Sequence, residues 1–302
     1  MLDILIQAGS YVAIIFLGMF LRRVGFFGPE AFPVLSSVVI KITLPAAIIY
    51  NAAGRTIDTQ MLLIPLLGLA GGILYIAVAA LVHIRGTKEQ RSFAVLNTAG
   101  YNIGVFAMPF TQGFLGSMGV AATTLFDVGN SFICLGGSFG AASAIKAGEA
   151  FNLRRILKTL ATSIPFVTYV ITVTMNLLYI PIPGPVVSCA KLISGANAAM
   201  AMLMVGVGFQ LSGDRSQAAT IARILVPRYA IAAVLALCYY LFLPFSLEVR
   251  QTLVILCFSP IGAAVPGFTQ ELGEDTGLSS AINSIAILIS IVIIVTLLVI
   301  ML

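Results

Sequence analysis

Asn102-Ile-Gly-Val-Phe-Ala-Met-Pro-Phe-Thr-Gln112 and Pro260-Ile-Gly-Ala-Ala-Val-Pro-Gly-Phe-Thr-Gln270 are two similar stretches, one in each half of the chain. Aligned at a constant offset, they share Ile-Gly and Phe-Thr-Gln. Each also carries a proline, Pro109 or Pro266, one position out of register. Self-similarity of this kind indicates an internal repeat, and the repeat decides the fold that we expect.

The surroundings of both stretches are strongly apolar. Of the 302 residues, 60% are hydrophobic and 9% are charged, whereas about 25% of the residues in a soluble domain are charged. So few charged residues cannot cover the surface of a water-soluble globular protein. The sequence therefore predicts an all-α integral membrane protein in a lipid bilayer. This excludes most soluble enzymes and any nucleic-acid-binding module. The four cysteines match no disulfide framework or zinc site, and we expect no metal or other cofactor.

Turn and charge signals divide the chain into ten apolar segments, each about as long as the roughly 20 residues that a spanning helix needs. The first apolar run continues to Leu21 without a positively charged start, so we expect a retained first span. An outer-membrane barrel would need segments of about 10 residues with alternating hydrophobicity. The continuous apolar runs of this chain exclude it. The predicted spans are 5–22, 33–52, 61–83, 93–115, 119–145, 160–181, 186–211, 222–244, 250–270 and 278–302.

The basic residues lie mainly on one side of the predicted membrane. The loops after spans 1, 3, 5, 7 and 9 contain Arg22, Arg23, Arg85, Lys88, Arg91, Lys146, Arg154, Arg155, Lys158, Arg215 and Arg223. The opposite loops contain only Arg55 and Arg250. Because basic residues gather in cytoplasmic loops, we expect both termini outside the cell membrane, which is the inner or plasma membrane.

The repeat and the span count together predict an inverted architecture. Residues 1–150 and 151–302 would each hold five spans, and an odd number turns the second unit upside down. Asn130-Ser131 and Asn283-Ser284 follow the two similar stretches at comparable depth and support this division. Inverted repeats are typical of secondary transporters.

Predicted spans 4 and 9 contain the two similar stretches, and both place glycine, proline and polar groups inside a helix. Glycine weakens a helix by about 1 kcal/mol and proline by about 3 kcal/mol. Unpaired backbone must then line a cavity or be paired by protein. Two interrupted helices in matching halves indicate a midplane binding site, where helix N-termini and Asn102 would bind an anion. The alternative is that glycine and proline only allow close packing.

Short motifs spread along nearly the whole chain carry a family resemblance. They are Leu17-Gly18, Leu21 through Phe26, Leu44-Pro45-Ala46, Asn102 through Pro109, Val205 through Gly208, and Ser259-Pro260. Their order and spacing resemble the auxin efflux carrier family of bacterial and plant permeases, which includes the plant PIN auxin carriers. Tyr101 stands where the plant carriers have a proline, and their long cytosolic loop is absent. We therefore do not expect auxin as the substrate.

The resemblance implies ten helices in two inverted five-helix repeats, with broken helices 4 and 9 crossing at the substrate site. Spans 1, 2, 6 and 7 would form a scaffold, and spans 3–5 and 8–10 a transport domain that moves like an elevator. We assign the substrate site to residues at the two breaks. These residues are Tyr101, Asn102, Gly104, Pro109, Pro260, Gly262 and Pro266.

A few ionisable residues fall inside the predicted spans. Asp127 in span 5 is followed one turn later by Asn130 on the same face. A charge at the bilayer centre costs at least ~2.5 kcal/mol, so Asp127 is a candidate for carrying a proton or binding a cation; structural pairing is the alternative. Lys41 and Lys191 occupy corresponding helices and would either attract an anion or extend to the interface. Arg223, Arg228 and His83 are expected at the interface.

These features predict a secondary permease for a small organic anion such as a carboxylate, moved outward and driven by the membrane potential or a proton gradient. The anion, protons and the bilayer are its expected partners, and a homodimer is left open. A membrane-embedded sensor or channel is the alternative. An intramembrane enzyme is less supported, because the chain has no His-Glu-x-x-His, no intramembrane aspartate pair and no Gly-x-Ser-Gly with a partnering histidine.

Overall fold

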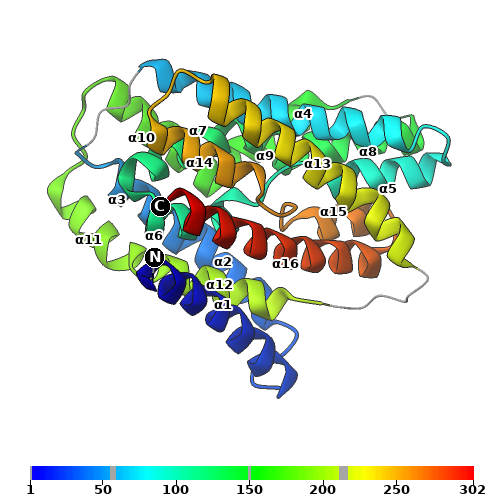
Figure 1. Ribbon diagram of the computed structural model, residues 1–302, viewed down its shortest axis with the longest axis horizontal. Coiled ribbons are helices and arrows are strands. Elements are labelled where there is room, and N and C mark those ends of the chain that lie inside the picture. Colours follow the sequence, from blue (N-terminus) through cyan, green and yellow to red (C-terminus); the bar gives the residue numbers. More distant parts are fainter. Residues whose placement is uncertain (1, 55–58, 149–150, 211–216) are drawn as a thin grey trace.

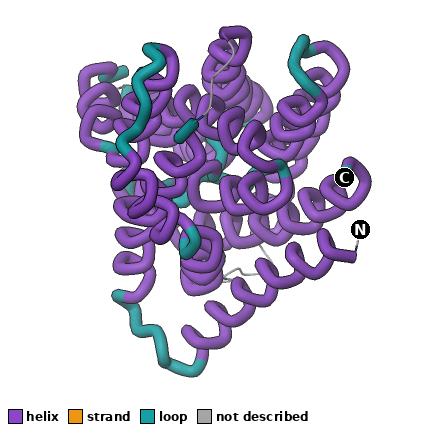
Figure 2. Tube along the Cα trace, turned by 90° about the vertical axis from the view of Figure 1, so that its left-hand side faces the viewer, coloured by secondary structure: helices purple, strands orange, loops and turns teal. Residues whose placement is uncertain are grey.

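The computed structural model describes residues 2–302 with gaps at 55–58, 149–150 and 211–216. Arg55 and Arg215, used above to predict orientation, and Leu211, the last residue of predicted span 7, lie outside the described residues. Within the described part the chain is helical and has no strand (Figure 2). This confirms the predicted all-α class.

A helix or a group of consecutive helices covers each of the ten predicted apolar segments. In the first half the order is α1 (Leu2–Arg23), α2 (Ala31–Val38), π-helix η1 (Val39–Thr43), α3 (Leu44–Ala52), 3-10 helix η2 (Thr59–Leu63), α4 (Ile64–Val82), α5 (Lys88–Thr98), π-helix η3 (Ile103–Ala107), α6 (Met108–Phe114), α7 (Gly116–Phe132), π-helix η4 (Ile133–Gly137) and α8 (Ser138–Ala147). In the second half it is α9 (Leu153–Thr162), α10 (Ile164–Leu177), α11 (Gly184–Ser194), α12 (Asn197–Gly208), α13 (Ala218–Phe242), α14 (Leu247–Cys257), α15 (Val265–Glu271) and α16 (Thr276–Met301).

Six helices of the described chain are long and apolar enough to cross a membrane. Two bent pairs raise the number to eight if each pair is one span: α9 with α10, bent by 76°, and α11 with α12, bent by 40°. The pairs α5–α6 and α14–α15, which cover predicted spans 4 and 9, are not among these eight. Each of them is interrupted by several non-helical residues.

Large apolar side chains cover much of the outer surface. Phe20, Leu66, Leu192, Phe242 and Val292 are each more than half exposed. A soluble protein rarely exposes so extensive an apolar surface, whereas hydrocarbon chains solvate it well. The surface therefore agrees with an integral membrane protein.

The contacts between helices divide them into two packing sets, and in Figure 1 α1 and α12 lie in the lower part of the molecule whereas α4 and α13 lie in its upper part. In the first set α1 lies along α12, α2 also contacts α12, and α3 contacts α10 and α11. In the second set α4 contacts α5, α7 and α13, while α13 packs on α14 and α15 on α16. Contacts of α12 with α6 and of α10 with α7 join the two sets.

Glycines allow the closest helix contacts in both sets. A Cβ on Gly206 of α12 would collide with the backbone carbonyl of Ile15 in α1, and one on Gly129 of α7 would collide with that of Pro65 in α4. Small residues at such contacts let helix backbones approach closely in a membrane, where dispersion rather than the hydrophobic effect drives association. The tight contacts explain the glycines at these positions.

Candidate functional site

The two interruptions meet in the interior of the molecule. Helix α5 ends at Thr98 and the chain is unwound as far as Asn102, whereas α14 ends at Cys257 and the next α-helix begins at Val265. The backbone N–H of Asn102 donates a hydrogen bond to the carbonyl of Pro260 at 2.9 Å. The two similar sequence stretches, 158 residues apart, are therefore directly bonded at their unwound segments.

A proline lies in the second half of each interrupted helix. Pro266 stands in the first turn of α15, where a proline removes no helical hydrogen bond and its fixed φ suits the helix. Pro109 directly follows the π-helix η3, so it lies inside a continuous helical stretch that begins at Ile103, where it lacks the N–H of an interior helical residue. Pro260 alone of the three lies within a break, and its carbonyl is the acceptor for Asn102. Gly100 adopts φ +77°, a conformation that favours glycine, in the other break.

Arg228 binds both interruptions, so its prediction as an interfacial anchor is wrong. Its side chain on α13 is 1% exposed. The guanidinium donates to the carbonyls of Thr98, Gly100 (2.9 Å) and Ser259 (2.8 Å). The error arose because α13 begins at Ala218, which is earlier than predicted. At 1.5 Å per residue, Arg228 lies about 15 Å along the helix rather than at its start.

The charge of Arg228 is balanced by backbone dipoles. No carboxylate of the described residues forms an ion pair with it. The carbonyls it binds lie at or just beyond the C-terminal ends of α5 and α14, where a helix dipole is negative. The guanidinium also lies 4.7 Å from the Tyr75 ring centroid and 5.7 Å from that of Tyr101. Arg228 thus donates hydrogen bonds to carbonyls that the interruptions leave without helical partners.

The Asn130 side chain forms hydrogen bonds with the backbone of the break in span 4. Its Oδ1 accepts from the N–H of Tyr101 at 3.0 Å, and its Nδ2 donates to the carbonyl of the same residue at 2.8 Å. Nδ2 also donates to Asp127 Oδ1 at 2.8 Å, as expected for side chains one turn apart on one face. The second oxygen of Asp127 accepts from the Tyr169 hydroxyl of α10 at 2.8 Å. Asp127 is therefore buried, hydrogen-bonded and linked to the break.

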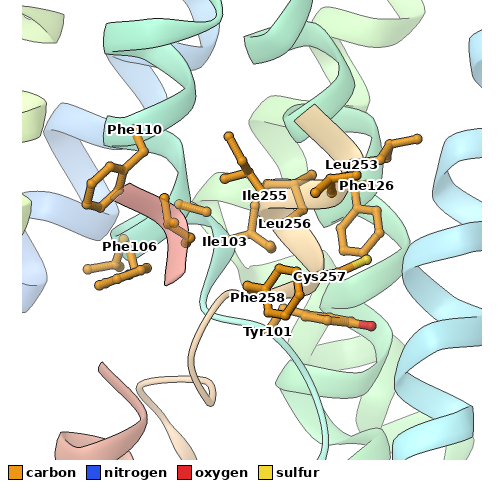
Figure 3. Close-up of a cluster of buried hydrophobic side chains, with 14 of the residues drawn as sticks. Tyr101, Ile103, Phe106, Phe110, Phe126, Leu253, Ile255, Leu256, Cys257 and Phe258 are labelled. Carbon is orange, nitrogen blue, oxygen red and sulfur yellow. The ribbon is translucent and has the colours of Figure 1, made fainter. Parts of the chain in front are cut away.

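Tyr101 contributes its backbone rather than its side chain to this arrangement. The side chain is 1% exposed, and its ring packs against Tyr75 and Phe126. Figure 3 shows Tyr101 among the buried apolar side chains. The hydroxyl has no hydrogen-bond partner among the described residues. Because the phenol points into the hydrophobic core beside Gly71, it does not line the cavity described below.

The two predicted site glycines lie where neighbours approach closely. A Cβ on Gly104 would come within 2.7 Å of Leu44 and 3.5 Å of the Asp127 carboxylate. A Cβ on Gly262 would lie 3.3 Å from the Cys134 sulfur. That thiol itself lies 3.3 Å from Asn130 Oδ1.

A cavity of about 410 Å³ opens beside the crossing. It lies between α1, α2 and α12 on one side and α15 and α16 on the other. Its volume is in the range of sites for small molecules. Of the predicted site residues, Asn102 and Pro266 line it. The polar and charged lining residues are Asn102, Arg22, Gln210, Gln270, Thr276, Ser280 and Asn283.

Comparison with known families adds to this geometry. Residues 10–154, just under half of the chain, match the family model described as membrane transport protein. This match places residues 10–154 in the auxin efflux carrier family of membrane transport proteins. The match includes the break in span 4, Asp127 and Asn130, and it ends before α13, α14 and α16. No curated protein matches the chain.

Two lysines of the predicted spans lie away from this site. Lys41 on η1 and Lys191 on α11 are both exposed, and neither lines the cavity. Among the described residues, neither forms an ion pair. Their part in ion coupling stays a prediction, and the described geometry provides no contact with Asp127.

The predicted site left out six polar or charged residues that line the cavity: Arg22, Gln210, Gln270, Thr276, Ser280 and Asn283. Arg22 was used for the orientation of the chain and for a family motif, and Gln210 was not considered. Asn283 was noticed only as the counterpart of Asn130 in the repeat, and its Oδ1 is buried without a partner. That correspondence was the one signal that could have identified Asn283. The places of Arg22 and Gln210 depend on how α1 and α12 pack against α16.

Proposed function

We propose that the protein is a secondary transporter for a small organic anion such as a carboxylate, and that the cavity beside Asn102 is the substrate site. The observation that carries the proposal is the cavity at the meeting point of two interrupted helices. Arg22 is the one charged lining residue in the described part of the chain, so the cavity favours a negatively charged ligand. Family membership supports transport rather than enzymatic chemistry.

The ten-span inverted repeat, with units 1–150 and 151–302, is part of the same proposal. The packing supports it through a pair of related contacts. Predicted span 1 packs on span 7 through α1 and α12, and predicted span 6 packs on span 2 through α10 and α3. An inverted repeat turns the first contact into the second, because it exchanges span 1 with 6 and span 2 with 7.

An elevator-type movement accounts for the place of the cavity. Predicted spans 1, 2, 6 and 7 would form the scaffold, and spans 3–5 and 8–10 would move. The cavity lies between these groups, with α1 and α12 on the scaffold side and α15 and α16 on the other. Arg22 in the last turn of α1 lines the cavity, and this end of α1 is on the predicted cytoplasmic side. The described conformation would therefore bind its anion from the cytoplasmic side. Both termini would lie on the outer side of the cell membrane.

Coupling to a proton gradient would involve Asp127, and the membrane potential is the alternative driving force. Asp127 in α7 belongs to the group proposed to move, whereas its partner Tyr169 in α10 belongs to the scaffold. A carboxyl group at this boundary can exchange its partner when the groups move. Loss or gain of a proton would then change the cost of breaking the bond.

Uptake into inside-out proteoliposomes tests the proposed function. We expect saturable uptake of labelled carboxylates, which Asn102→Ala lowers by at least about tenfold, while Asn51→Ala, on α3 outside the cavity, leaves it unchanged. Both variants must elute as folded protein. Undiminished uptake by Asn102→Ala would contradict the proposed site. Unsaturable, linear flux would indicate a channel, and absence of flux for every carboxylate would support a sensor.

A further inference from the structure

Arg22 has a side chain fixed at the edge of the cavity. It stands in the last turn of α1, and its Nη1 donates to the carbonyl of Val207 in α12 at 2.5 Å. A guanidinium has five N–H donors in a planar fork, and this bond uses one of them. The bond therefore holds the group in place while leaving donors for a ligand.

Among the described residues, the cavity has no acidic lining residue that would neutralise Arg22. Its other polar lining groups are amides and hydroxyls, and no described carboxylate forms an ion pair with the guanidinium. A positive charge that is half-buried and unpaired attracts an anion more strongly than one in bulk water, because the local dielectric constant is lower. The charge is thus positioned to be paired by a ligand.

Asn102 and Asn283 add amide groups to the cavity that Arg22 faces. Asn102 belongs to the break in span 4, and Asn283 lies on α16 with its Oδ1 buried and unpartnered. Amides of this kind supply both donors and an acceptor, which suits hydroxyl, carbonyl or second carboxylate groups. Asn283 lies on the side of the cavity opposite α1.

We infer that Arg22 binds one carboxylate of the transported anion in a bidentate contact, with the remainder of the anion facing Asn102 and Asn283. This inference rests on the proposed function and deepens it by naming the residue that selects a carboxylate. Arginine suits the role because its fork matches both carboxylate oxygens, whereas lysine is a point charge. The ligand would then bridge α1 and α16.

The neighbouring Arg23 provides a matched control. It carries the same charge in the same turn of α1, yet its side chain is exposed and does not line the cavity. Arg22→Gln and Arg23→Gln therefore alter the net charge and the predicted loop charge equally. A difference between them isolates the contact inside the cavity.

The test measures binding of acetate, malonate and malate, with malonamide as the uncharged analogue, to purified protein and in proteoliposomes. We expect Arg22→Gln to raise the half-saturating concentration of the bound carboxylates at least about tenfold and Arg22→Lys to raise it several-fold. Arg23→Gln should stay within about twofold of the wild type. Malonamide should bind equally weakly to all four proteins, because it has no carboxylate.

Unchanged carboxylate affinity in Arg22→Gln would overturn the inference. If that variant does not fold, unchanged affinity in Arg22→Lys overturns it instead, because lysine cannot form the bidentate contact. When the wild type transports a carboxylate and Asn102→Ala does not, unchanged carboxylate affinity in Arg22→Gln refutes this inference and leaves the proposed function standing. A wild type that transports none of the carboxylates refutes the proposed function.

Discussion

Replacing Arg228 with glutamine should destabilise the protein more than most other single substitutions. The guanidinium is buried at 1% exposure and joins three carbonyls, from Thr98, Gly100 and Ser259. These carbonyls belong to both interrupted helices. Glutamine is shorter and uncharged, and its one amide nitrogen cannot reach all three acceptors. At least one buried carbonyl would be left without a partner.

The expected loss can be estimated from these contacts. A hydrogen bond to a charged group contributes about 1.5–3 kcal/mol, so three contribute several kcal/mol before the cost of burying the guanidinium is subtracted. Removing one partner of a buried charged arrangement costs about 3–5 kcal/mol. We expect the lower part of this range for Arg228→Gln, which corresponds to a fall in Tm on the order of 10 °C.

Thermal unfolding of the purified protein in detergent, followed by far-ultraviolet circular dichroism, measures this loss. Arg223→Gln is the matched control, because Arg223 is an exposed arginine on the same helix. Its effect should be within about 0.5 kcal/mol, as for other surface substitutions. Equal Tm values for Arg228→Gln and Arg223→Gln would refute the reasoning. The three carbonyls would then be satisfied without the guanidinium.

Two further outcomes follow from the packing and from the buried carboxylate. Gly129→Ala should destabilise the protein by about 1–3 kcal/mol, because its Cβ would collide with the Pro65 carbonyl. Gly9→Ala on α1 meets open space and should be neutral or slightly stabilising; equal melting of the two variants would contradict the close contact. Asp127→Asn should flatten the pH dependence of carboxylate uptake, because it removes a buried titratable group. An unaltered pH profile would exclude Asp127 from proton coupling.

Several features could be predicted because their causes are local in the chain. Apolar runs about as long as the bilayer is thick predict the helices, and glycine and proline within two of them predict the interruptions. The spacing of Asp127 and Asn130 predicts that they share a helix face, and their side chains are hydrogen-bonded. Even so, Pro109 and Pro266 lie in the helical segments that follow the interruptions, and of the three predicted site prolines only Pro260 lies within an interruption.

Arg228 and Arg22 show where sequence reasoning fails. Both were assigned by their distance from a predicted span end, and both assignments treat an arginine near an interface as solvated. Arg228 lies deep in the interior because α13 starts earlier than predicted, and its partners are backbone carbonyls that no sequence motif reveals. Arg22 lines the cavity because α1 packs along α12.

The sequence by itself determined a helical membrane protein with two interrupted helices and the family of its first half. These properties depend on hydrophobicity, helix propensity and short motifs, which are local. Only the tertiary structure decided that the interruptions are bonded to each other, that Arg228 and Asn130 hold them, and that Arg22 faces the cavity. The reason is physical: unpaired backbone groups must find partners, and those partners come from whichever distant helices pack nearby.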